Sequence, residues 1–202
     1  MAEEKNISAI ILDKQPHAEA SLLITAFSQE EGLVFLYKKM SAKKTSFAPD
    51  LFDEIFCQVQ APNKESSVRF LKDFDVKKTR RGLAISYEKL CAASEISSIV
   101  KQNGTHINET TELAQLLRVA LDSIELAQNL DAVKIKFLYL LVKNQGYAVK
   151  EDFFASLPAA EKNNFTKILK TPISQLSEEI ASAQHLYKIL KYWVQEHTDI
   201  TF

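Results

Sequence analysis

The stretch from residue 20 to residue 39 reads ASLLITAFSQEEGLVFLYKK, and it decides the class of the N-terminal part of the chain. Apolar, β-branched and aromatic side chains recur at every second position on both sides of the step Gln29–Gly32, whose residue types favour a hairpin turn. The same period-two pattern returns at residues 10–12, 55–59 and 68–71. Five short strands within about eighty residues are typical of a small five-stranded barrel.

Near residue 82 the apolar period changes to that of a helix. We expect one or two helices that end near Gly104, then a helix capped by Asn108 and another that runs from Asp131 to Gly146. A shorter helix contains Phe165, and the last helix begins at Thr171-Pro172. The predicted fold class is therefore α+β, with a five-stranded β-barrel over residues 1–80 followed by an all-α domain over residues 81–202.

Composition excludes several classes of protein. The chain has 202 residues, 46% hydrophobic residues and a net charge of -1, which is typical of a folded globular protein. No apolar stretch is long enough to cross a membrane, and residues 1–6 do not resemble a signal peptide, so we expect a cytoplasmic protein with no membrane partner.

Catalytic and metal-binding patterns are equally sparse. Four glycines form no phosphate-binding loop, the four histidines lack metal-pair spacing, and Cys57 and Cys91 are both expected to be buried apolar groups. We predict no metal, no cofactor and no enzymatic activity. A hydrolase with an unrecognised site is the alternative that the residues leave open.

Positive charge is concentrated in the predicted barrel. Residues 32–82 hold eleven basic and six acidic residues, whereas residues 83–202 hold twelve basic and fourteen acidic ones. Two acid-free clusters stand out, residues 38–44 and 77–81. If the clusters converge in space, they form a groove that attracts phosphates and releases counterions. Tyr37 and Phe47 lie beside the first cluster, where an aromatic ring could stack on a base.

The segments Ala9–Leu12 and Ala18–Lys39 resemble the start of the bacterial recombination mediator family RecO, which shows strands separated by a Glu-x-Gly turn. Phe47-Ala48-Pro49 is similar to the family's Leu-Gln-Pro-Phe step, and Lys136–Leu141 with Gly146-Tyr147 is similar to a helix of its second domain. The resemblance implies an N-terminal OB-fold barrel on a helical C-terminal domain.

The resemblance also implies a function in DNA repair and recombination. Its elements are binding of single- and double-stranded DNA, annealing of complementary strands, and loading of the RecA recombinase. The implied partners are RecR and the acidic C-terminal tail of the single-stranded DNA-binding protein. The chain departs from the family by having Met40 where a glycine is usual, and by lacking paired Cys-x-x-Cys zinc ligands.

Two sets of candidate residues follow. The DNA-contact candidates combine the family's basic strand end and loop with the charge clusters, and they are Lys38, Lys39, Lys43, Lys44, Phe47, Lys77, Lys78, Arg80 and Arg81. An acidic peptide tail with an apolar end needs an apolar pocket with a cationic rim. The candidates for that rim, on the two most apolar predicted helices, are Arg118, Lys134 and Lys136. The alternative function is a barrel-plus-helices module that binds protein and no nucleic acid, which the near-neutral charge favours.

Overall fold

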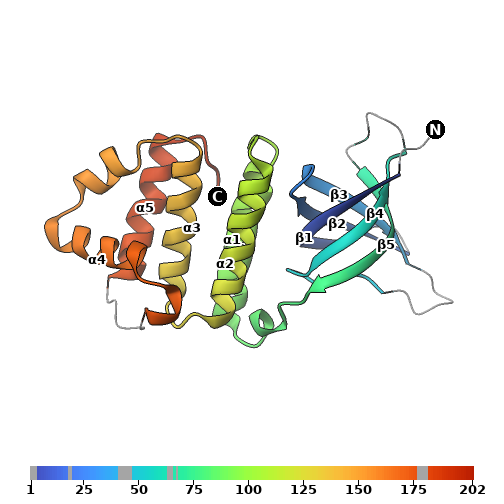
Figure 1. Cartoon of the computed structure of the whole chain (residues 1–202), viewed down its shortest axis with the longest axis horizontal. Coiled ribbons are helices and arrows are strands. Elements are labelled where there is room, and N and C mark those ends of the chain that lie inside the picture. Colours follow the sequence, from blue (N-terminus) through green and yellow to red (C-terminus); the bar gives the residue numbers. More distant parts are fainter. Residues whose placement is uncertain (1–3, 18–19, 41–46, 63–65, 67, 177–181) are drawn as a thin grey trace. The chain divides into compact units, whose positions relative to one another are not determined.

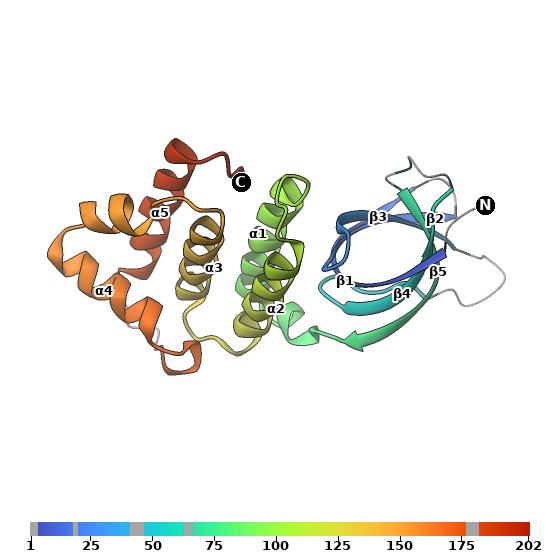
Figure 2. The ribbon, with the colours of Figure 1, turned by 45° about the horizontal axis from the view of Figure 1, so that its top comes forward.

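The structure is a computed structural model, and it describes residues 4–17, 20–40, 47–62, 66, 68–176 and 182–202. Five strands form a closed barrel with the order β1-β2-β3-β5-β4 (Figures 1 and 2). They are β1 (Glu4–Pro16), β2 (Ser21–Ser28), β3 (Gly32–Lys39), β4 (Glu54–Gln60) and β5 (Val68–Lys78). This order, with helices after it, confirms the predicted OB-fold barrel followed by a helical part.

The strands of the barrel are strongly tilted. A path of paired residues leaves β1 at Glu4, crosses β4 at Gln60, β5 at Phe70 and β3 at Tyr37, and continues through β2. It returns to β1 at Gln15, near the opposite end of the strand from Glu4. Such a stagger is the geometric condition for closing a barrel of so few strands.

Alternating side chains fill the barrel interior. The apolar core residues of this interior come from all five strands, and Leu22 and Phe74 pack against them at partial burial. The predicted hairpin turn between β2 and β3 is present, and Gly32 adopts a φ of 72° there. Only glycine takes such a backbone conformation without steric cost, which explains the Glu-x-Gly step.

Two compact units make up the chain. The first contains residues 1–80 and 100–115, and the second contains residues 81–99 and 116–202. Residues 100–115 contact the barrel through Thr110, whose Oγ1 donates to the Gln29 carbonyl at 2.9 Å, and through an ion pair of 3.1 Å between Lys101 and Asp13. The grouping has one of its boundaries between Arg80 and Arg81, where the sequence predicts the division, and it adds residues 100–115 to the first unit.

The helical elements are mostly where the apolar period predicts them. They are η1 (Arg81–Ala84), α1 (Tyr87–Asn103), α2 (Thr110–Leu126), α3 (Leu130–Asn144), η2 (Lys150–Phe154), α4 (Ala159–Lys170), η3 (Ile173–Gln175) and α5 (Ala183–His197). Within the second unit α3 packs against α5, and Figure 1 shows the two helices side by side. The predicted cap Asp131 is wrong, because the Oδ1 atom of Asn129 accepts from the Ala132 amide instead.

The prediction of one helix starting at Thr171-Pro172 is also wrong. The segment there is a 3-10 turn that ends at Leu176, whose φ of -87° and ψ of 108° are those of extended backbone. Leu176 is nevertheless buried, so its apolar side chain reaches the core without belonging to a helix. Residues 177–181 lie outside the described part, and α5 begins at Ala183.

Candidate nucleic-acid interface

The first basic cluster begins at the end of β3, where two lysines occupy different positions. Lys39 is exposed and pairs in register with Ser21. Lys38 is half-buried, and its ammonium lies 5.1 Å from the centre of the Phe74 ring. Since Phe74 packs against the barrel core, Lys38 lies toward the interior side of the barrel wall.

The next three candidates follow β3 along the chain. Lys43 and Lys44 lie outside the described residues, so they remain sequence-based candidates only. Phe47 is described and 74% exposed, a high value for a phenylalanine. A ring with that exposure is available to stack on a partner.

The second basic cluster begins at the end of β5 and has mixed surroundings. The Lys77 ammonium lies 5.5 Å from the centre of the Phe56 ring and 3.9 Å from a carboxylate oxygen of Asp75. Lys78 is exposed and pairs in register with Glu54. Lys77 therefore lies on the outer face of the sheet, since Phe56 points outward between the buried residues Ile55 and Cys57.

Arg80 requires a correction. Its guanidinium side chain is completely buried, donates from Nη1 to the Phe52 carbonyl at 2.7 Å, and contacts Glu54 at 3.4 Å through Nη2. Phe52 has a φ of 66°, a conformation that non-glycine residues rarely adopt, and this hydrogen bond helps to hold it. A buried guanidinium does not reach phosphates, so Arg80 is a structural residue, whereas its neighbour Arg81 is exposed.

Lys38 and Lys77, one from each cluster, lie on different faces of the described barrel wall. Lys38 contacts the interior-facing Phe74 and Lys77 contacts the outward-facing Phe56. Asp73 and Asp75 are both exposed and flank Phe74 on β5. Counting net charge over residues 32–82 concealed this alternation of lysine and aspartate, and the positive groove expected from the sequence is therefore not continuous over β5.

Exposed aromatic rings on the outer face of the barrel were not among the sequence candidates. Phe56 is 40% exposed and Phe70 is 39% exposed. Phe70 pairs in register with Tyr37, and the two rings meet edge to face with their centres 5.6 Å apart. Tyr37 points outward, since its neighbour Leu36 belongs to the core of the barrel interior. The strand register, which the sequence does not provide, is what places these rings together.

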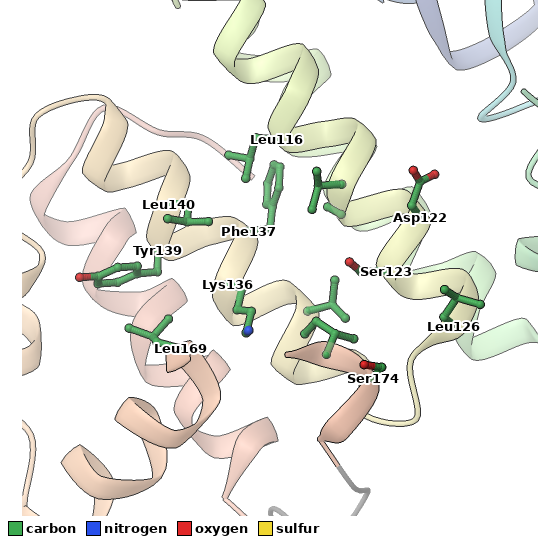
Figure 3. Close-up of a pocket in the computed structure, with 14 residues that line it drawn as sticks. Leu116, Asp122, Ser123, Leu126, Lys136, Phe137, Tyr139, Leu140, Leu169 and Ser174 are labelled. Carbon is green, nitrogen blue, oxygen red and sulfur yellow. The ribbon is translucent and has the colours of Figure 1, made fainter. Parts of the chain in front are cut away.

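The second unit contains an apolar pocket of about 630 Å³. Its walls come from α2, α3, the end of α4 and η3 (Figure 3). Figure 3 shows Phe137 and Lys136 projecting from α3 and Leu116 projecting from α2, with Leu169 at the far side. Two lining residues, Leu126 and Val119, are strongly exposed, so the pocket opens to solvent with an apolar edge.

Only one of the three predicted rim residues lines this pocket. Lys136 does so, its ammonium donates to the Thr171 carbonyl at 2.5 Å, and burial lowers its pKa from the usual value. Lys134 instead forms ion pairs with Asp131 at 2.7 Å and Glu95 at 3.4 Å. Arg118 is half-buried on α2 and is not part of the pocket lining.

Candidate groups for catalysis or metal binding are few. Among the described residues, no group of three or more His, Cys, Asp and Glu side chains is arranged to hold a metal ion. Cys57 is buried as predicted, and burial first, with help from Glu30 and Glu31, raises the pKa of its thiol to about 12. Cys91 is exposed, which corrects the expectation that it is buried. Over the same described residues, none of the helices has the length and apolar character needed to cross a membrane.

Comparison with known proteins narrows the class. A closed five-strand barrel in this order, followed by helices, defines an OB-fold protein with a C-terminal helical part. No family model matches the chain. The chain is similar to the DNA repair protein RecO of Mesoplasma florum, with 27% identity over 146 residues.

That match covers 71% of this chain and 55% of the Mesoplasma protein, so the chain spans about half the length of the curated relative it matches. A stretch of 146 residues exceeds the length of either predicted domain, so it includes parts of both. Together with the barrel topology, the match supports a divergent member of the RecO family.

Proposed function

We propose that the chain binds single- and double-stranded DNA through its barrel and acts in DNA repair and recombination. The observation that carries the proposal is an OB-fold barrel in a chain similar, across both parts, to a protein named for DNA repair. OB-folds commonly bind oligonucleotides by combining cations with aromatic side chains. The described barrel offers both, with Lys39 and Lys78 exposed and Phe56 and Phe70 on its outer face.

Within that role, the proposed activities are annealing of complementary strands and loading of RecA together with RecR. Annealing follows from weak electrostatic contacts, because cations reduce the repulsion between two backbones and salt-sensitive contacts let strands slide into register. The alternation of lysine and aspartate on β5 keeps those contacts few. The proposal therefore predicts moderate affinity that falls with salt, rather than tight duplex binding.

The test is a titration of a labelled single-stranded oligonucleotide at two or more salt concentrations. About three phosphate contacts give a log-log slope of about -2 on single strands. Replacing Lys39 with Gln should make the slope shallower by about 0.7. Lys188→Gln on α5 is the charge-matched control because Lys188 is exposed in the second unit, and its slope should equal that of the unmodified protein. Binding that does not respond to salt contradicts the proposal.

We also propose that the apolar pocket of the second unit binds the acidic C-terminal tail of the single-stranded DNA-binding protein. A peptide with an apolar end and acidic residues suits a cavity with exposed leucine at its edge and one lysine in its wall. In Figure 3 the carboxylate of Asp122, which also belongs to the lining, is directed away from Lys136.

Fluorescence anisotropy of a labelled acidic peptide with an apolar C-terminal residue tests this binding. Leu126→Ala and Lys136→Gln should each weaken it at least fivefold, which is about 1 kcal/mol. Tyr192→Ala, which removes a 65% exposed ring elsewhere in the same unit, should have no effect. Equal affinity of all variants excludes the pocket as the site.

The alternative function is a protein-binding module without affinity for nucleic acid. The apolar pocket and the carboxylates on β5 favour it. Two measurements distinguish these functions, namely RecR binding in gel filtration and oligonucleotide binding at low salt. RecR binding without oligonucleotide binding fits only the alternative.

A further inference from the structure

The outer face of β3, β5 and β4 carries aromatic rings where a solvated sheet usually carries polar side chains. Phe70 and Phe56 are 39% and 40% exposed, and Tyr37 is half-buried beside Phe70. The interior of the barrel is filled by other residues, among them Leu36, Cys57 and Leu71. These outward rings are therefore not required by the core.

Strand register arranges the rings along the sheet. Tyr37 and Phe70 are direct partners on β3 and β5, and Gln60 of β4 continues the same row. Leu23 of β2 is the register partner of Tyr37 on the other side, and the centre of the His17 ring lies 5.8 Å from that of the Tyr37 ring. Phe56 lies four residues from Gln60 along β4, which is roughly 13 Å at the rise of a strand. The face thus offers two ring positions, Tyr37 with Phe70 and Phe56 alone, which are far enough apart to stack on different bases of one strand.

Lysine side chains lie close to both phenylalanine rings. The Lys72 ammonium is 6.0 Å from the Phe70 ring centre, and the Lys77 ammonium is 5.5 Å from the Phe56 ring centre. Contact of a cation with an exposed ring strengthens an equilibrium by only about twofold to fivefold. Stacking of a base on a ring strengthens the binding equilibrium by about fivefold to a hundredfold. A base can therefore replace each ammonium over its ring, and the freed lysine then pairs with a phosphate.

Carboxylates on the same face restrict which nucleic acid fits. Asp73 and Asp75 line a shallow cavity of about 280 Å³ together with Phe56, Gln58 and Asn6. Phosphates that approach these carboxylates are repelled, whereas uncharged bases are not. A single strand can turn its bases toward the sheet and its phosphates outward, but a duplex has its bases already stacked and paired.

We propose that Tyr37, Phe70 and Phe56 form a base-stacking surface that selects single-stranded over double-stranded DNA. This inference rests on the proposed function, since it names the part of the barrel and the kind of strand that binds there. On this surface the rings provide most of the affinity for single strands, and the lysines provide the salt dependence of binding.

The experiment compares ring variants of the full chain by titration with a labelled single-stranded oligonucleotide, and with the duplex of the same sequence, at several salt concentrations. Phe70→Ala and Phe56→Ala should each weaken single-strand binding by about fivefold to a hundredfold, while duplex binding and the salt slope stay unchanged. Phe70→Leu keeps an apolar side chain of similar size and should lose most of the same affinity with little effect on folding. Tyr192→Ala, in the second unit, is the control for loss of an exposed ring.

A second variant gives a gain of binding, which misfolding cannot imitate. Asp73→Asn removes an exposed carboxylate from the surface and should tighten single-strand binding, because a charge within about 10 Å of a phosphate acts on it at 0.1 M salt. If the unmodified chain binds DNA but the Phe70 and Phe56 variants bind equally well, the stacking surface is wrong and the proposed function stands. If the unmodified chain does not bind DNA at low salt, both are wrong.

Discussion

Arg80 offers a decisive comparison between a structural and a DNA-binding cation. Replacing it with Ala removes a guanidinium that is fully buried and that contacts the Phe52 carbonyl and the Glu54 carboxylate. Breaking a buried pair by removing one partner costs about 3–5 kcal/mol, mostly because the other group stays buried without its charge partner. The Glu54 side chain is 16% exposed and regains some hydration, so we expect a loss of about 3 kcal/mol.

Urea unfolding followed by circular dichroism measures this loss as a lower midpoint at unchanged slope. The matched control is Arg81→Ala, the exposed neighbour, which should change the free energy of unfolding by no more than about 0.5 kcal/mol. Where the Arg80→Ala protein remains folded, its salt slope for DNA binding should equal that of the unmodified chain. An Arg80 variant of normal stability with a shallower salt slope would refute the reasoning.

Three further predictions concern other parts of the chain. Gly104→Ala should destabilise the first unit, since a Cβ there would lie 2.7 Å from the Val100 carbonyl oxygen, and thermal unfolding measures the loss. Burial raises the pKa of Glu95, but the positive charge of Lys134 and further partners outweigh burial and hold the pKa below its ordinary 4.5. The ionised Glu95 therefore stabilises the fold above that pH, and this stabilisation is lost as the pH falls. Glu95→Gln should therefore show a shallower loss of stability in acid than the unmodified chain. Asn129→Ala removes the N-cap of α3 and should cost about 1 kcal/mol in urea unfolding.

The barrel was predictable because its pattern is local. Alternation at period two identifies each strand, and the Glu-x-Gly step marks the hairpin where Gly32 has a positive φ. Closure of the barrel and the parallel pairing of β3 with β5 depend on contacts between residues far apart in the chain. The sequence carries no local signal for such pairings, and the OB order came from the resemblance to RecO.

The candidate site was less predictable, because a count of charges along the sequence does not show which partner each side chain has or on which face it lies. Arg80 looked like part of a basic cluster, yet Phe52 and Glu54, both distant in sequence, bind its guanidinium in the structure. Lys134 and Lys136 are neighbours in sequence, but a helix turns them to different surroundings, one in an ion-pair network and one in the pocket. Two residues apart on a helix, Lys134 and Lys136 lie on different faces, and the helical period predicts this separation from the sequence.

The account depends most on the claim that DNA binds to the barrel. Nuclear magnetic resonance of the ¹⁵N-labelled full chain, with and without a single-stranded oligonucleotide, tests that claim residue by residue. We expect amide shifts to change around Lys39, Phe56 and Phe70, while those around Lys188 and Tyr192 of α5 stay in place. Changes confined to the helices of the second unit, or no changes at saturating oligonucleotide, would contradict it.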